Sequence, residues 1–193
     1  VPRAAYAPVH GSITAAEDKT LSFTLTYAGE GWGGTAKTAP TQDKNGVYQI
    51  GTAVELAWFA DAVNGGQKAI NGKLTANINL NDKTWTAFGK YDYKLEGKSG
   101  FAGTLDGDRH IVSGLKSTEG LVSCLSSAGT VKNLTVDGSV KADSTGSNGI
   151  GHAAGVVAYL AGGTVKMCVN RASVTTDKCC YTAGIVGGSG NGK

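Results

Sequence analysis

Short apolar runs recur in a fixed order along the second half of the chain, separated by glycine and small polar residues. Residues 155–174 repeat residues 120–140 with a single gap near Gly162, and a third copy begins within residues 183–187. The copies start at residues 120, 155 and 184, so the repeat unit is 35 and then 29 residues long. A unit of this length that recurs in order is typical of repeat architectures, in which each unit packs against its neighbours.

Each copy contains three short runs that favour β-strands, for example residues 155–159, 164–169 and 173–176, and these runs show no helical period. The Gly, Asn and Asp residues between them tolerate the positive φ that tight corners require. Three strands and three corners make one coil, and a coil needs neighbours to cover its inward side chains. The pattern predicts a mainly β fold, a right-handed parallel β-helix with three strands per coil. The alternative is an antiparallel β-sandwich with turn-rich strands.

The repeat alignment also predicts which side chains stack inside the column. Each fully buried Val, Leu or Ile contributes roughly 1.5–3 kcal/mol, so three stacked coils supply a substantial core. Cys168 aligns with Leu134 and is expected to be a small inward residue of the same kind. The expected ladder takes one aliphatic pair from each copy: Leu121 and Val122, Val156 and Val157, and Ile185 and Val186.

One amphipathic helix is expected before the repeats, over residues 52–64. Thr52 followed by Glu55 has the spacing of a capping box, and Gly65-Gly66 supplies the stop. Leu56, Phe59 and Val63 share one face of this helix. We expect it to cap the otherwise bare first coil of a β-helix module that spans residues 47–193.

The remainder of the chain predicts two further parts. Residues 1–30 contain a clean alternation at Leu21, Phe23, Leu25 and Tyr27, which indicates a strand, either an edge strand or the end of a preceding module. Residues 31–46, rich in glycine, are expected to be a linker. The sequence ends within a coil, so we expect the module to be truncated at its C-terminal end and to belong to a longer polypeptide.

Composition and charge limit the classes of partner that the chain is expected to bind. The chain has 193 residues, 17% of them charged, with a formal net charge of +3 at pH 7. Its lysines are scattered, so no nucleic-acid surface is expected. The longest apolar run, residues 153–161, is far shorter than the roughly 20 residues that a membrane-spanning helix needs, so no membrane insertion is expected.

Recognisable motifs occur in order at residues 48–60, 73–80, 85–86 and 101–107 and at the openings of the three repeats. Together they resemble the GLUG-repeat modules of bacterial secreted and cell-surface proteins. The resemblance covers about residues 32–193 and implies a right-handed β-helix in a large multidomain protein, such as the non-catalytic regions of immunoglobulin A protease relatives. It implies an extracellular role in adhesion, spacing or glycan contact, and it supplies no catalytic residue. At residues 108–110 the chain has Asp-Arg-His where the family usually has Asn-Gly-His.

An acidic turn at Asp106 and Asp108 is the strongest candidate for chemistry. Carboxylate oxygens are ligands for Ca²⁺, and Arg109 and His110 follow, as in β-helix lyases that pair Ca²⁺ with a basic residue. Asp-Gly-Asp is also an ordinary turn sequence, because Asp accepts backbone hydrogen bonds and Gly allows positive φ. We expect a turn, no required cofactor, and Ca²⁺ as the alternative.

Three aromatic residues are the candidate ligand contacts. Trp85, Tyr91 and Tyr93 fall in residues 81–100, a longer insertion than a corner requires, and exposed rings are surfaces on which sugars stack. The alternative is that Trp85 and Phe88 point inward and only the tyrosines lie outside. His152 has no partner at the spacing of a metal site or a catalytic triad.

The four cysteines leave their pairing open. Cys124, Cys168, Cys179 and Cys180 allow three pairings, and the sequence lacks the CxxC spacing of a zinc site. Cys179 and Cys180 point to opposite faces if they lie in a strand, so one of them could reach Cys168 or Cys124.

These observations predict a non-catalytic extracellular module of a bacterial surface protein. Its expected role is adhesion, ligand binding or spacing, with a host or bacterial glycan, or a protein, as partner. The rival hypothesis is a fragment of a carbohydrate-active β-helix enzyme, a polysaccharide lyase or hydrolase, which would need a cleft with several convergent titratable groups.

Overall fold

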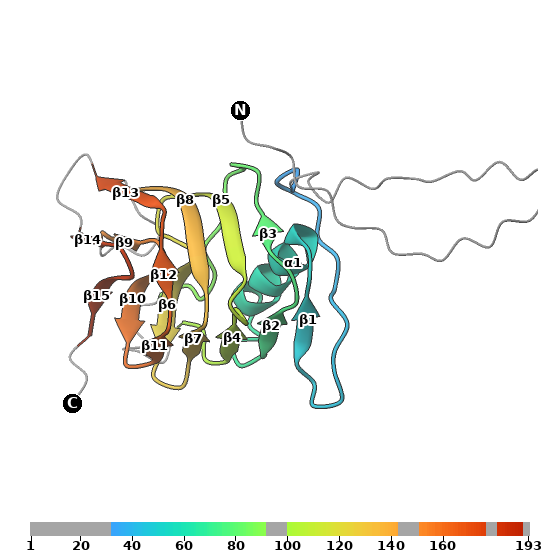
Figure 1. Ribbon diagram of the computed structural model, residues 1–193. Coiled ribbons are helices and arrows are strands. Elements are labelled where there is room, and N and C mark those ends of the chain that lie inside the picture. Colours follow the sequence, from blue (N-terminus) through green and yellow to red (C-terminus); the bar gives the residue numbers. More distant parts are fainter. Residues whose placement is uncertain (1–31, 92–99, 143–150, 177–180, 191–193) are drawn as a thin grey trace, which may run out of the picture.

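The computed structural model describes residues 32–91, 100–142, 151–176 and 181–190. The fold is mainly β with one helix, and every pair of neighbouring named strands in these residues runs parallel (Figure 1). The predicted strand around Leu21 lies outside the described residues, as do Tyr93, Cys179 and Cys180.

The first sheet contains five strands in sequence order, β1-β2-β4-β7-β11. Its strands are only three residues long, and each belongs to a different passage of the chain round the molecule. They are β1 (Tyr48–Ile50), β2 (Gly72–Leu74), β4 (Thr104–Asp106), β7 (Thr130–Lys132) and β11 (Thr164–Lys166).

A second sheet has the order β12-β8-β5-β3, with β13 also paired to β8. Four of its strands each follow a strand of the first sheet along the chain, and the fifth, β13, follows β12 of the same sheet. Its members are β3 (Ile78–Asn79), β5 (Ile111–Ser117), β8 (Thr135–Ala142), β12 (Val169–Asn170) and β13 (Ser173–Thr176).

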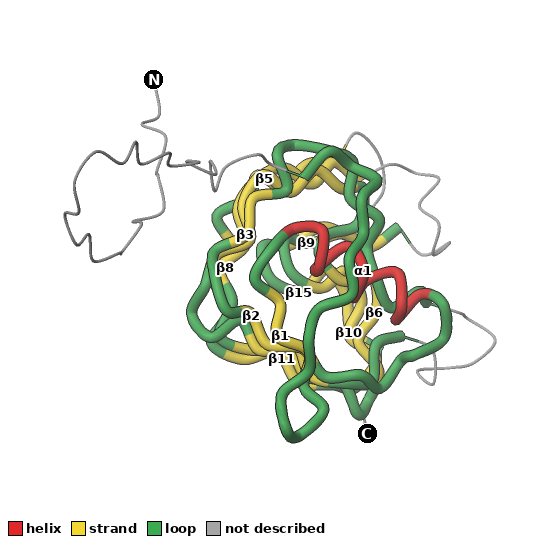
Figure 2. The backbone as a smooth tube through the Cα atoms, turned by 90° about the vertical axis from the view of Figure 1, so that its right-hand side faces the viewer, coloured by secondary structure: helices red, strands yellow, loops and turns green. Residues whose placement is uncertain are grey.

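The remaining strands form a third sheet of the order β15-β10-β6 and a two-stranded sheet, β14-β9. Viewed from the end that carries the helix, the chain runs round the molecule and strands of successive passages overlie one another (Figure 2). These strands are β6 (Val122–Ser126), β10 (Val157–Ala161), β15 (Val186–Ser189), β9 (His152–Ala154) and β14 (Tyr181–Ala183).

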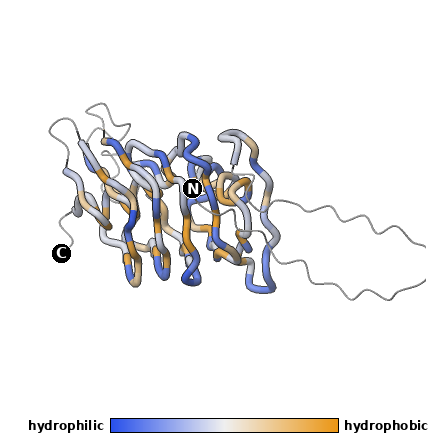
Figure 3. The backbone as a smooth tube through the Cα atoms, turned by 45° about the horizontal axis from the view of Figure 1, so that its top comes forward, coloured by the Kyte–Doolittle hydropathy of each residue, from blue (hydrophilic) through white to orange (hydrophobic). Residues whose placement is uncertain are grey.

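The strand register equals the alignment of the sequence repeats. Val157 lies opposite Val122 on one side and Val186 on the other. Thr164 lies opposite Thr130, which is the pairing that the repeat predicts. Val122 and Val157 are fully buried and Val186 is half-buried, so like positions of successive repeats stack in one continuous core. Apolar segments accordingly recur from strand to strand (Figure 3).

Two details differ from the predicted pattern of three strands per repeat. Residues 164–169 form two strands because Met167 adopts a φ of 53° and turns the chain between β11 and β12. Asn133 has the same φ of 53° at the matching corner between β7 and β8, where an Asn accepts this conformation more readily than most residues. The second difference is the pair of short strands β9 and β14, which adds a fourth small sheet.

The predicted helix is present as α1 (Ala53–Asn64), and its capping box is formed. The Glu55 carboxylate accepts hydrogen bonds from the Thr52 amide at 2.9 Å and from the Gly51 amide at 2.8 Å. Leu56 and Phe59 are fully buried beneath the helix, which lies across the end of the molecule nearest the viewer in Figure 2. At twelve residues, this helix of the described chain is too short to cross a bilayer.

An aromatic cluster joins the helix to the strands. Phe59 of α1 meets Phe88 and Phe101 with ring centroids 5.9 and 5.8 Å apart, and the last two are 5.3 Å from each other. All three contacts are edge-to-face, the arrangement that aromatic quadrupoles favour. Phe88 and Phe101 form isolated bridges to Val122 and Leu125, so both phenylalanines lie beside β6.

Candidate functional site

The acidic turn forms links between neighbouring strands. One oxygen of the Asp106 carboxylate accepts hydrogen bonds from the Asp108 amide and the Asn133 side chain, both at 3.0 Å. Its other oxygen pairs with Lys132 at 2.8 Å. Burial tends to raise the pKa of Asp106, but the hydrogen bonds from Lys132, the Asp108 amide and Asn133 outweigh it and hold the pKa below its ordinary value.

Asp108 is paired to a different strand. Its carboxylate lies 3.0 Å from the Lys73 ammonium, and this hydrogen bond and charge raise the pKa of Lys73. Asp106 and Asp108 thus each contact a lysine of a neighbouring strand, β7 for one and β2 for the other. Among the described residues, His, Cys, Asp and Glu side chains form no group of three that could hold a metal ion.

Trp85 lies inside the molecule. Only 4% of its surface is exposed, and its indole N–H donates to the Leu121 carbonyl at 3.0 Å. Phe88 is fully buried, so of the two arrangements open from the sequence, the inward one holds for both residues. Trp32 packs edge-on against Trp85 with ring centroids 5.7 Å apart.

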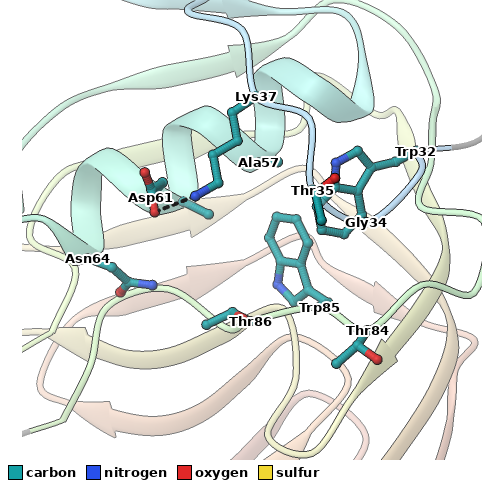
Figure 4. Close-up of a pocket in the computed structure, with 11 residues that line it drawn as sticks. Trp32, Gly34, Thr35, Lys37, Ala57, Asp61, Asn64, Thr84, Trp85 and Thr86 are labelled. Carbon is teal, nitrogen blue, oxygen red and sulfur yellow. Dashed lines mark ion pairs between the residues drawn. The ribbon is translucent and has the colours of Figure 1, made fainter.

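A pocket of about 320 Å³ opens beside these two indoles (Figure 4). Its walls come from α1, from residues 32–37 and from residues 84–86, and a Lys37–Asp61 ion pair of 2.7 Å spans it. The segment expected to be a linker therefore contributes one wall. Trp85 lies here, whereas Tyr91 lies elsewhere, so the structure separates two residues that the sequence grouped in one insertion.

Tyr91 begins a surface row of four rings. It meets Tyr159 at a centroid distance of 4.8 Å, and His152 lies 5.3 Å from Tyr159. His152 in turn stacks on Tyr181 at 5.2 Å with an angle of 22° between the ring planes. We call Tyr91, Tyr159, His152 and Tyr181 the aromatic row.

The strand register positions the aromatic row. His152 of β9 and Tyr181 of β14 are direct cross-strand partners, and Tyr159 lies on β10 opposite Gly188 of β15. Cross-strand pairs of this kind bring side chains within contact distance. The row therefore crosses several neighbouring strands rather than following one.

Two glycines leave space for these rings. A Cβ atom at Gly188 would occupy the position of the His152 imidazole, and one at Gly190 would lie 2.8 Å from the Tyr159 hydroxyl. Tyr181 is 69% exposed, while the other three members of the aromatic row are half-buried. The row is thus an aromatic surface with fixed inner rings and an open outer one.

Sequence reasoning identified Tyr91 in this row and missed its neighbours. The signal for His152 was present, because extending the third repeat backwards by two residues from Ala183 aligns Tyr181 with His152. Tyr159 could not be paired with Tyr91 from the sequence, since Tyr91 belongs to an insertion that has no counterpart in the repeats. That contact required the three-dimensional arrangement.

Cys168 lies where the repeat alignment predicts. Its neighbour Val169 is the register partner of Thr135, so Cys168 falls at the position of Leu134, and its side chain packs against the core. Burial raises the pKa of the Cys168 thiol. The pairing with Cys179 or Cys180 lies outside the described residues.

Comparisons of the chain with models of protein families, with curated proteins and with solved structures find no match.

Proposed function

We propose that this chain is a non-catalytic binding module, built as a right-handed parallel β-helix, that contacts carbohydrate through the aromatic row. Three features support the β-helix: parallel sheets, a chain that passes from one sheet to another at most consecutive strands, and a register that repeats with the sequence. α1 covers one end of the stack, as the terminal unit of a repeat array must.

The aromatic row is the observation that carries the binding proposal. Aromatic faces and edges contact the apolar C–H surfaces of sugar rings, while phenol hydroxyls and imidazole nitrogens bond to sugar hydroxyls. Because the rings cross neighbouring strands, an extended oligosaccharide could touch more than one of them. The inner rings are held by packing, which lowers the entropic cost of binding.

The composition of the row favours binding over catalysis. Its members supply three phenols and one imidazole, whereas glycoside hydrolysis ordinarily requires a pair of carboxylates on either side of the bond. Asp106 and Asp108, the acids considered for lyase chemistry, are paired with Lys132 and Lys73 instead.

The sequence motifs that resemble GLUG-repeat modules support a proposal about the setting of the module. We propose an extracellular, cell-surface location in a bacterium, with other domains in the same polypeptide and a host or bacterial glycan as partner.

A glycan array tests the proposal with the unmodified chain and two variants, Tyr159→Ala and Tyr181→Ala. Tyr159 touches two rings of the row, so its removal should weaken binding about tenfold or more, and loss of the outer Tyr181 ring should weaken it several-fold. Met167→Ala is the control, because Met167 is 70% exposed at the corner between β11 and β12. Thermal unfolding of each variant checks its fold.

Two results would overturn the proposal. One is an array without any bound glycan, which would leave the chain as a spacer. The other is binding that survives both tyrosine substitutions. Cleavage of a bound glycan would contradict the non-catalytic part alone.

A further inference from the structure

The pocket beside Trp85 is left unfilled because small residues line it. Ala57 and Ala60 lie one turn apart on the same face of α1, and their small side chains leave the volume unfilled. Gly34, with a φ of 99°, turns the opposite wall in a conformation that other residues rarely adopt.

The wall formed by residues 32–37 is fixed at both ends. The Trp32 amide donates to the Asn79 carbonyl at 3.5 Å, and the Thr38 amide donates to the Val54 carbonyl at 3.1 Å. The end of the pocket is held by Asn64, whose side-chain amide bonds to the backbone of residues 87 and 89 at 3.2 and 3.0 Å. The cavity is therefore preformed, which is the usual state of small-molecule sites.

Its indole lining presents carbon rather than polar atoms. The Trp85 N–H is bonded to the Leu121 carbonyl, and the Trp32 N–H is bonded to the Ala36 carbonyl at 2.9 Å. Both donors are thus used within the protein, and the two rings offer apolar edges to the pocket (Figure 4).

The polar side chains of the lining are Lys37, Asp61, Asn64 and the hydroxyls of Thr35, Thr84 and Thr86. The Lys37–Asp61 pair is half-exposed, with 43% and 60% of the two side chains accessible. An ammonium has three donors and a carboxylate about four acceptor positions, so each retains capacity beyond the ion pair. The pocket therefore offers a donor and an acceptor side by side next to an apolar surface.

From this arrangement we propose that the pocket binds one ring of a neutral polyhydroxylated ligand, a pyranose sugar. Hydroxyl groups can accept from Lys37 and donate to Asp61 while the ion pair stays intact. An anionic or a cationic ligand would be attracted by one member of the pair and repelled by the other. The volume of about 320 Å³ lies at the small end of ligand pockets and suits a single ring. This second site does not depend on the aromatic row.

Intrinsic fluorescence provides a direct assay, because Trp32 and Trp85 line the pocket and the chain has only three tryptophans. A Trp58→Phe background removes the third. The probes are free glucose, galactose, mannose and N-acetylglucosamine, with glucuronate and glucosamine as charged comparators. We expect a saturable change with at least one neutral sugar and weaker binding of both charged comparators.

Asp61→Asn is the decisive variant, since it preserves shape but removes the charged acceptor. Affinity for the sugar should fall about tenfold or more, the usual effect of losing a hydrogen bond to a charged group. Asp108→Asn is the matched control, because it breaks the Lys73–Asp108 pair, which has similar exposure, away from the pocket. Exposed pairs contribute little to stability, so both variants should remain folded. Lys37→Met repeats the test from the other partner.

Several outcomes would overturn the pocket assignment: no saturable change with any neutral sugar, tighter binding of glucuronate or glucosamine, or unchanged affinity in Asp61→Asn. Loss of the fluorescence change in Tyr159→Ala would locate the sugar on the aromatic row instead. The pocket and the aromatic row can therefore fail separately.

Discussion

Asp106 illustrates how a single side chain connects two distant parts of the chain. It receives hydrogen bonds from its own turn and from Asn133, and it pairs with Lys132 of the next strand. The sequence identified this acid but could not show its partners, because Lys132 is 26 residues away and faces Asp106 only through the register of β4 and β7. The same limitation applies to Asp108 and Lys73.

The lowered pKa of Asp106 predicts a pH dependence. Its pKa is lower in the folded than in the unfolded chain, so the stabilisation is fully present above the unfolded value of about 3.9 and is lost as pH falls through the folded value. Asp106→Asn should lower the free energy of unfolding by about 1 kcal/mol at pH 7. Urea unfolding at pH 7 and in steps below pH 4 measures the difference.

The control for this prediction is Asp137→Asn. Asp137 is exposed and accepts a hydrogen bond from the adjacent Gly138 amide, so its change should stay within about 0.5 kcal/mol. The unmodified chain and Asp106→Asn should differ less in free energy of unfolding as the pH falls. If the difference stays constant down to acidic pH, the assigned role of the carboxylate is contradicted.

Gly188 provides a second residue-scale test, this time of the aromatic row. An alanine there would displace the His152 ring from Tyr159, so glycan binding should weaken about threefold to tenfold, the value of one aromatic contact. In Gly184→Ala the nearest atom would be 3.6 Å from the new Cβ, so binding should be unchanged. Equal affinities in the two variants, measured on the array ligand, would argue against His152 as part of the site.

At the scale of elements, the sequence repeats predict the strand register well but predict the positions of the corners poorly. Identical spacing in successive copies predicted that Val157 lies between Val122 and Val186, and the register confirms it. The corner at Met167 was missed because an unbroken β-favouring run carries no signal of where the chain turns. The helix was predictable since its capping box and its apolar face are local features.

Removal of the capping box of α1 should measurably lower the free energy of unfolding. Thr52→Ala removes the side chain that bonds to the Glu55 amide, and such changes cost about 1 kcal/mol of stability. Thr38→Ala is the control, since Thr38 is exposed and its amide bond to the Val54 carbonyl is kept. Chemical denaturation compares them, and equal stabilities would mean that the cap does not limit the stability of this end.

At the scale of the whole molecule, the core thins from the helix end towards β15. Val122 and Val157 are fully buried, whereas Ile185, Val186 and Val174 are half-buried. In a stack of repeats each layer is stabilised by its neighbours, so truncating a side chain in an outer layer removes less buried apolar contact.

This gradient in burial predicts that the same substitution lowers the free energy of unfolding by different amounts in different layers. Val157→Ala should lower the free energy of unfolding by roughly 1–3 kcal/mol, the contribution of a buried valine, and Val186→Ala by less than half as much. Both residues lie in the same ladder, so each serves as the control for the other. Equal losses in urea unfolding would show that β15 is covered as fully as β10.

NMR tests most directly whether the aromatic row binds carbohydrate. Aromatic-ring resonances of tyrosine and histidine should be recorded while the tightest-binding glycan of the array is added to the intact chain. The account predicts saturable shifts for the rings of Tyr159, His152 and Tyr181, with Tyr48, packed against α1 residues, unchanged. Shifts confined to other residues, or no shifts at glycan concentrations that saturate binding, would contradict it.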